Sequence, residues 1–306
     1  MDQQYTIAGL DLPYINEEDK LCRILSSALE KPGGNLRNNP TSRVTYRDAP
    51  HFNLDKVNIF RDSTPVEQSS ILQLCNYGLL EEAYFIEKAG VGYMAKMVLL
   101  AETTEERMLY GLFAADEATH LAQISRFLPT PKVNHNPFLN LLEDVVKSEN
   151  KTVLLFVLQV VLEGWGLTHY RSIAADCQNP DLSSVFHGFL QDESRHHATG
   201  VTLFEKMCLS KSSQEIIVEI LAMFLQMVQL GPQSVVAAIE QVKGHLSKAH
   251  KIKIFEELNT VNHSGSRLKL LRGLMHLPNA IAIVENLEVK GSFQALKANQ
   301  CVLNRE

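Results

Sequence analysis

The order of hydrophobic and polar positions predicts a helical chain, and no segment of any length has the pattern of a strand. Proline and glycine separate the expected helices from one another. The predicted helices cover residues 16–29, 66–101, 104–127, 137–147, 150–176, 180–209, 214–230 and 233–246, with shorter pieces near 255, 268–275 and 279–287. The fold class is therefore expected to be all-α.

Two of the helix starts have recognisable caps. Thr103 and Glu106 form a capping box, in which a hydroxyl and a carboxylate satisfy free N–H groups at the start of a helix. Asn179-Pro180 opens another helix, because proline suits the first helical position. These caps fix the starts of the two helices that carry the chemistry described below.

Composition agrees with a folded helical protein. The chain has 306 residues, of which 45% are hydrophobic and only 7% aromatic, which excludes disorder and disfavours folds of many short strands. A net charge of −6 gives no electrostatic attraction to nucleic acid or anionic lipid. The start lacks the pattern of a signal peptide, and the apolar run 153–158 is too short for a membrane span. Five cysteines without a CxxC pair indicate reduced thiols, so we expect a cytoplasmic protein.

The sequence Glu-x-x-His occurs twice, as Glu117-Ala-Thr-His120 and Glu193-Ser-Arg-His196, each time preceded by an aspartate. Residues three apart share one face of a helix, so each motif presents a carboxylate beside an imidazole. Oxygen ligands with one nitrogen suit Fe or Mn. Two such pairs supply half of a dinuclear centre, and the other half requires one glutamate from each of two further helices.

The two halves of the chain repeat at an offset of 76 residues, which identifies those glutamates as Glu87 and Glu163. Glu81 and Glu82 are the alternatives to Glu87, but neither has an acidic counterpart at this offset. Glu163 interrupts the apolar stretch VLLFVLQVVLEGWGL, where a carboxylate is costly unless it is paired or binds a metal.

At this point the chain resembles the ferritin-like diiron-carboxylate superfamily, whose pattern is E…ExxH…E…ExxH on four helices, over residues 66–209. The resemblance implies a four-helix bundle with a crossover between its second and third helices. Asp116 and Asp192 would orient the histidines contributed by the opposite helix pair. The six metal ligands that the resemblance implies are Glu87, Glu117, His120, Glu163, Glu193 and His196.

Three regions follow from this resemblance. Residues 1–65 would be an N-terminal extension with a short helix and a loop. Residues 66–209 would be the diiron bundle. Residues 210–306 would be helices that pack on the bundle. Because a minimal iron-storage bundle needs no such flanks, the extra length favours an oxygenase or oxidase over a ferritin.

The second motif, Asp192-Glu193-Ser-Arg195-His196, is similar to the D-E-x-R-H pattern of oxygen-activating branches such as bacterial multicomponent monooxygenases. The first motif has Thr119 in place of that arginine. Ile124 stands where ribonucleotide reductases place a radical tyrosine, and Phe189 stands where aminoarene N-oxygenases add a histidine. Rubrerythrins usually carry a CxxC domain, which this sequence lacks.

Three neighbouring residues have two interpretations each. His197 is a candidate for an additional metal ligand, and a structural role is the alternative. Gly90 lies one turn beyond Glu87, and Gly166 lies one turn beyond Glu163. There the glycines would leave space for dioxygen or substrate. Close packing of helices is the alternative for both glycines.

The sequence thus predicts a non-haem diiron enzyme that uses O2 to oxidise a small organic substrate, apolar or aromatic. Hydroxylation, N-oxygenation, desaturation and cleavage remain open. The cofactor would be two Fe ions, with a mixed Mn/Fe centre as the alternative, and electrons would come from a ferredoxin or reductase. We also expect a homodimer without nucleic-acid or membrane partners. The rival functions are a ferritin- or rubrerythrin-like ferroxidase or peroxide scavenger, and a metal-free interaction scaffold.

Overall fold

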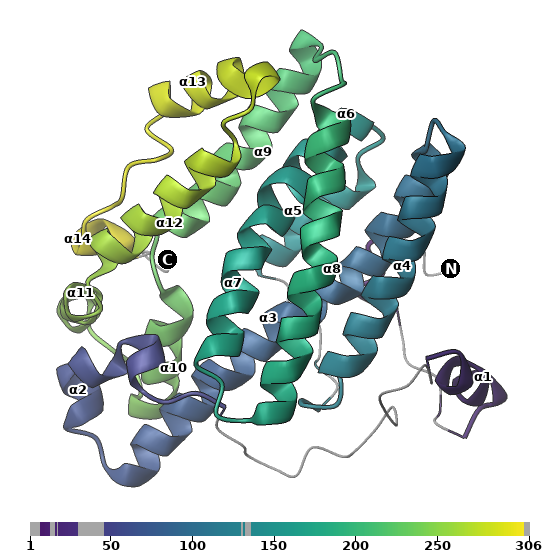
Figure 1. Ribbon diagram of the computed structural model, residues 1–306. Helices are drawn as coiled ribbons and strands as arrows, with labels where there is room; N and C mark the ends of the chain where they lie inside the picture. Colours follow the sequence, from purple (N-terminus) through teal and green to yellow (C-terminus); the bar gives the residue numbers. More distant parts are fainter. Residues whose placement is uncertain are drawn as a thin grey trace, which may run out of the picture. The chain divides into compact units, whose positions relative to one another are not determined.

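The computed structural model describes residues 7–12, 16, 18–29, 46–129, 131 and 136–302 (Figure 1). All regular secondary structure in this part of the chain is helical, which confirms the all-α fold class. The sequence is loop-like from Lys31 to Pro65; residues 30–45 lie outside the described residues, and the rest of this stretch contains short helical turns between residues 50 and 61. The chain divides into two compact units: unit 1 is Met1–Ser42 with Leu79–Lys151, and unit 2 is Arg43–Gly78 with Thr152–Glu306.

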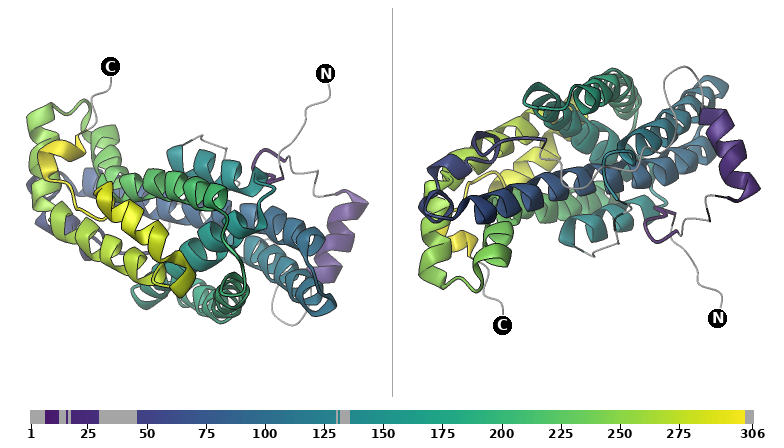
Figure 2. Two further views of the ribbon diagram at one scale, coloured as in Figure 1. Left: turned by 90° about the horizontal axis from the view of Figure 1, so that it is seen from above. Right: turned by 90° about the horizontal axis from the view of Figure 1, so that it is seen from below.

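Helix α3, Pro65–Leu100, begins in unit 2 and continues into unit 1 as one helix of 36 residues (Figure 2). The other helices of unit 1 are α1 (Lys20–Leu29), α4 (Thr104–Ile124) and α5 (Pro137–Lys147). Helix α1 starts four residues later than predicted, because the Asp19 side chain accepts a hydrogen bond from the Leu21 amide (2.8 Å) and so caps the helix there.

The start of α4 confirms one half of the predicted capping box. The Thr103 hydroxyl accepts a hydrogen bond from the Glu106 amide at 3.1 Å. The Glu106 carboxylate, however, accepts from the amide of Glu102 rather than from that of the cap residue (2.9 Å). The helix therefore begins where the sequence predicts, with the returning hydrogen bond shifted by one residue.

The end of α5 is held by a lysine from α3. Lys96 is buried, and its ammonium donates to the carbonyls of Val146 (3.0 Å) and Lys147 (3.1 Å). The last carbonyls of a helix lack partners within the helix and carry partial negative charge, so a cation is favourable there. Lys96 thereby ties the crossover helix to the helix that carries Glu87.

Unit 2 contains most of the remaining helices. They are the 3₁₀ turns η1 (Pro50–Phe52), η2 (Leu54–Lys56) and η4 (Pro278–Ala280), the π-helix η3 (Leu155–Leu162), and the α-helices α2 (Asn58–Arg61), α7 (Glu163–Ala175), α8 (Pro180–Phe204), α9 (Lys211–Gln229), α10 (Gln233–Lys243), α11 (Lys248–Glu257), α12 (Thr260–Leu274), α13 (Ile281–Val289) and α14 (Ala298–Cys301). Helix α6 (Lys151–Leu154) connects the two units.

Two helices of unit 2 end earlier than the sequence predicts. Helix α8 ends at Phe204 because Ser210 caps the next helix by accepting from the Ser213 amide (3.0 Å), which leaves the intervening residues as a turn. Helix α10 ends at Lys243 because Gly244 adopts a positive φ of 82°, which a helix cannot contain.

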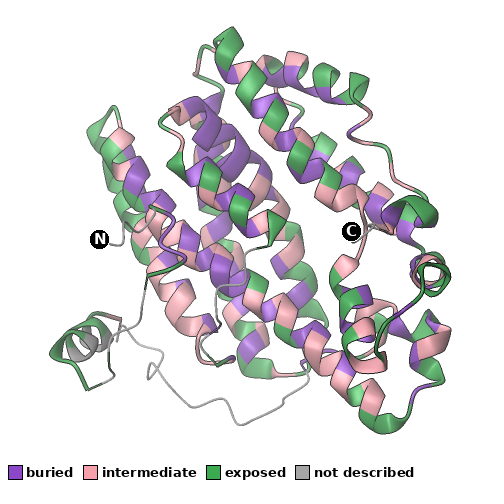
Figure 3. Ribbon diagram, turned by 180° about the vertical axis from the view of Figure 1, so that it is seen from behind, coloured by how far each residue is buried: buried purple, intermediate pink, exposed green. Residues whose placement is uncertain are grey.

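The longest apolar segment of unit 2 is the run of α6, η3 and α7, Lys151–Ala175. It is long and apolar enough to cross a membrane, but 61% of its most apolar stretch is buried in the fold, as expected for a core helix (Figure 3). The bent pair Lys211–Gln229 and Gln233–Lys243 would pass the same test only if it formed one span. Within the run, the Glu163 amide donates to the Leu158 carbonyl, five residues back, which is the spacing of a π-helix.

Candidate metal centre

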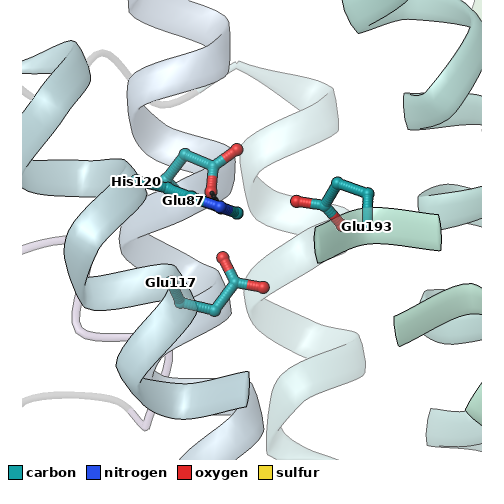
Figure 4. Close-up of side chains that lie close together, drawn as sticks. All are labelled: Glu87, Glu117, His120 and Glu193. Carbon is teal, nitrogen blue, oxygen red and sulfur yellow. Dashed lines mark hydrogen bonds and ion pairs between the residues drawn. The ribbon is translucent and has the colours of Figure 1, made fainter. Parts of the chain in front are cut away.

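Unit 1 brings together three of the six predicted ligands, which we call the unit 1 triad: Glu87 from α3, and Glu117 and His120 from α4. All three side chains are buried, with exposures of 0%, 4% and 2%. One ligand atom from each lies within 4.8 Å of the others, and the side chains point toward one another (Figure 4). Glu82 is exposed and Glu81 is half-buried, so Glu87 is the buried acidic residue of this stretch.

The unit 1 triad depends on close packing between α3 and α4. His120 Nδ1 lies 3.1 Å from Glu87 Oε2, which joins the two helices. A Cβ atom on Gly90 would lie 2.5 Å from Glu117 Oε2, closer than any side chain allows. The Glu117 carboxylate thus occupies the space that a side chain at residue 90 would fill.

Unit 2 brings together the other three predicted ligands, which we call the unit 2 triad: Glu163 at the start of α7, and Glu193 and His196 from α8. Their ligand atoms also lie within 4.8 Å of one another. Glu193 and His196 are buried, whereas Glu163 is half-buried. His196 Nδ1 lies 3.4 Å from Glu193 Oε2 of its own helix.

Each triad has the chemistry of a site for a divalent cation. Two carboxylates crowded together in a buried place repel one another and lose their hydration, which is costly unless a cation lies among them. The set of two oxygen donors and one imidazole nitrogen suits Fe or Mn, and is harder than the thiolate-rich sets typical of structural zinc. The residues therefore fit the metal that the sequence predicts.

The remaining predicted residues lie beside the triads. Asp116 and Asp192 are half-buried, and Asp192 forms an ion pair with Arg195 one turn along α8. His197 is half-buried, and its Nδ1 lies 3.1 Å from the Gln159 carbonyl oxygen. Among the described residues, no atom outside the glycine's own helical surroundings lies within 4 Å of a Cβ placed on Gly166. The roles predicted for these four residues stay predictions.

Buried aromatic side chains lie along the helices that carry the predicted ligands in both units. In unit 1 the Tyr110 and Phe113 rings meet edge to face at 5.9 Å, on the turns of α4 before Glu117. In unit 2 the Tyr170 ring lies 5.5 Å from that of Phe189, which is one turn before Glu193. All four rings are buried. They exclude water, which strengthens electrostatic interactions at the carboxylates.

Sequence reasoning assigned no role to Gln159. This residue is fully buried in η3, and its amide Nε2 donates to the backbone carbonyl of the ligand His196 at 2.8 Å. It is the one polar side chain of the segment LFVLQVVL. A lone polar residue in a buried apolar run is the feature that could have identified it, because such a residue must find a hydrogen-bond partner.

Comparison with known proteins places both triads in one family. Residues 70–206 match the family model described as ferritin-like domain. The search of curated proteins and that of solved structures gave no match. This segment is therefore a ferritin-like domain, a helical bundle of the superfamily that the sequence resembles, and it contains all six predicted ligands.

Proposed function

We propose that this protein is a non-haem diiron oxidoreductase that uses O2 to oxidise a small organic substrate. The observation that carries the proposal is the pair of triads, each of two carboxylates and one histidine, within a single ferritin-like domain. In the proposed centre, Glu87, Glu117 and His120 would hold one iron, and Glu163, Glu193 and His196 would hold the other.

When bound, iron of this kind supplies one-electron redox chemistry and the reduction of O2. The residues of the chain would bind the metal ions and exclude water from them. The four carboxylates balance the charge of the cations, and the two histidines offer neutral nitrogen ligands. The rings of Phe113 and Phe189 keep water away from the carboxylates on α4 and α8. Electrons come from an external ferredoxin or reductase, and the protein acts in the cytoplasm.

Helices beyond the ferritin-like segment support an enzyme with an organic substrate. In unit 2, α9 packs against α7, where the rings of Trp165 and Phe224 meet at 5.1 Å. Trp165 follows the ligand Glu163 by two residues, so a helix outside the ferritin-like segment covers the surroundings of a predicted ligand. A ferroxidase needs aqueous iron to reach its ligands, whereas an oxygenase benefits from an enclosed apolar surface.

The test is to reconstitute the protein with Fe(II) without oxygen, determine iron per chain, and then follow O2 consumption with a chemical reductant. We expect two irons per chain, and O2 consumption that a panel of apolar and aromatic compounds stimulates, with an oxidised product detectable by mass spectrometry. Glu193→Gln should lose iron, and Glu205→Gln, an exposed change at the end of the same helix, should not.

Two results would contradict the proposal. O2 consumption driven by Fe(II) alone, with ferric mineral inside a cage-like oligomer, would identify a ferroxidase. Less than one iron per chain after reconstitution, in a protein that remains folded, would identify a metal-free scaffold.

A further inference from the structure

The buried Gln159 connects the π-helix to the metal-ligand motif of α8. Its amide nitrogen donates to the carbonyl oxygen of His196 at 2.8 Å, and the contact is fully buried. That carbonyl belongs to the backbone of a predicted ligand. The hydrogen bond therefore fixes the backbone of α8 at the residue whose imidazole belongs to the unit 2 triad.

A second hydrogen bond joins the same two helices in the opposite direction. His197 Nδ1 lies 3.1 Å from the carbonyl oxygen of Gln159. Because a carbonyl can only accept, Nδ1 must carry the proton in this contact. Gln159 thus donates through its side chain and accepts through its backbone, and both partners are adjacent residues of α8.

The Gln159 carbonyl belongs to the π-helix η3. The Glu163 amide donates to Leu158, five residues back, while α7 continues with the four-residue spacing of an α-helix. Gln159 follows Leu158 directly, so its carbonyl lies close to the point where the five-residue spacing changes to four-residue spacing. The hydrogen bond from His197 satisfies this acceptor.

Gly200 allows the two helices to approach. A Cβ atom at residue 200 would lie 2.6 Å from Gln159 Cβ and 3.0 Å from its Cγ. The Gln159 side chain therefore crosses α8 over Gly200 and reaches the carbonyl one turn earlier. Gly188, on the same helix, has no atom within 4 Å of such a Cβ among the described residues, so it provides a matched position without this contact.

We propose that Gln159 is a positioning residue that sets the separation of Glu163 and His196, two ligands of the same metal ion in the proposed centre. Glu163 follows Gln159 by four residues in one continuous helix, and His196 is held through its own carbonyl. The helix of one ligand is thus joined directly to the backbone of the other. This inference rests on the proposed function, because it assigns those two side chains to a metal.

The first experiment compares Gln159→Leu with Gln229→Leu, using Co(II) as the probe. Gln229 is a matched control, because its amide donates to the carbonyls of Gly291 and Gln294 in the same unit but is remote in sequence from every ligand. We expect Gln159→Leu to weaken Co(II) binding about 10–100-fold and to alter the d–d absorption bands. Gln229→Leu should leave both unchanged, even where thermal unfolding of the metal-free protein shows a similar loss of stability.

The second experiment compares Gly200→Ala with Gly188→Ala. The new methyl group at residue 200 must push Gln159 and α8 apart, so we expect the same change in Co(II) affinity and spectrum as in Gln159→Leu. The methyl group at residue 188 meets no neighbour, so that variant should bind Co(II) as the wild type does.

The outcomes separate the two proposals. Wild-type protein that binds no Co(II) would overturn the proposed function and this inference with it. Wild-type binding that Gln159→Leu leaves unchanged in affinity and spectrum would overturn the role of Gln159 alone. If the two glutamine variants weaken binding equally, the effect is a general loss of stability, and the positioning role is wrong.

Discussion

The two triads have the same residue types at the same spacing, yet the two units hold them differently. In unit 1 the histidine contacts a glutamate of the other helix, since His120 Nδ1 lies 3.1 Å from Glu87. In unit 2 His196 Nδ1 lies 3.4 Å from Oε2 of Glu193, the glutamate of its own motif. Glu87 is fully buried in a regular α-helix, whereas Glu163 is half-buried and follows eight residues of π-helix.

Because of this difference we expect the two triads to have different roles. The unit 1 triad is enclosed, and its histidine contacts a glutamate of the other helix, which suits a metal ion that stays in place. The unit 2 triad has a more exposed glutamate and a helix of irregular spacing, and π-helical turns are frequent at functional sites. We therefore expect O2 or substrate to approach from the side of Glu163.

The largest effect should come from the motif glutamates, where the two units should behave alike. Glu117→Gln and Glu193→Gln each remove a charged oxygen ligand, so each should weaken iron binding by at least about 100-fold and abolish turnover. Iron titration followed by absorption spectroscopy measures this, with the exposed Glu105→Gln as control. Retained iron in either variant would contradict the assignment of that ligand.

A large effect on turnover alone is expected at Gly166. A Cβ atom there meets no neighbour within 4 Å among the described residues, and a leucine would extend further from the helix, one turn after Glu163. It should reduce turnover about 100-fold by occupying the space meant for O2 or substrate, while two irons remain bound. Gly111→Leu, at an exposed and equally open position of α4, is the control. Unimpaired turnover in Gly166→Leu would show that residue 166 does not border the space used by O2 or substrate.

A smaller effect is expected at Gly90, the residue that matches Gly166 in the sequence repeat. Gly90→Ala places a methyl group 2.5 Å from the present position of Glu117 Oε2, so the carboxylate must move. We expect about tenfold weaker metal binding, measured by Co(II) titration. Gly166→Ala should bind as the wild type does and gain up to about 1 kcal/mol of helix stability. Equal affinities in the two alanine variants would show that Glu117 adapts without cost.

The smallest effect is expected on the free energy of unfolding of the metal-free protein, where Glu87 and Glu163 should differ. Glu87→Gln weakens a buried contact to His120, so we expect a loss of about 1–3 kcal/mol in the free energy of unfolding. Glu163→Gln should cost less, because Glu163 is half-buried whereas Glu87 is fully buried. Urea unfolding in the presence of a chelator measures both. A larger cost at Glu163 would reverse the contrast between the units.

The sequence predicts which side chains the structure brings together in each triad, because metal chemistry restricts both residue type and spacing. Glutamates and histidines three residues apart can be recognised without a structure, and the 76-residue repeat selects Glu87 over Glu81. The π-helix could not be predicted, because the run LFVLQVVL fits an α-helix equally well by hydrophobicity. Gly90 and Gly166 correspond in the repeat, but their surroundings depend on tertiary packing, which the repeat does not encode.

The residues of each triad come from two helices that are consecutive in the chain, α3 and α4 in unit 1 and α7 and α8 in unit 2. The order of folding can therefore follow the order of the chain. His120 follows Glu87 by 33 positions, and His196 follows Glu163 by the same number. Contacts of such short sequence separation form rapidly, because little loop entropy is lost when they close. During synthesis the first three ligands are translated before the second three. A nascent chain can therefore hold three ligands for one metal ion before the remainder of the ferritin-like domain exists.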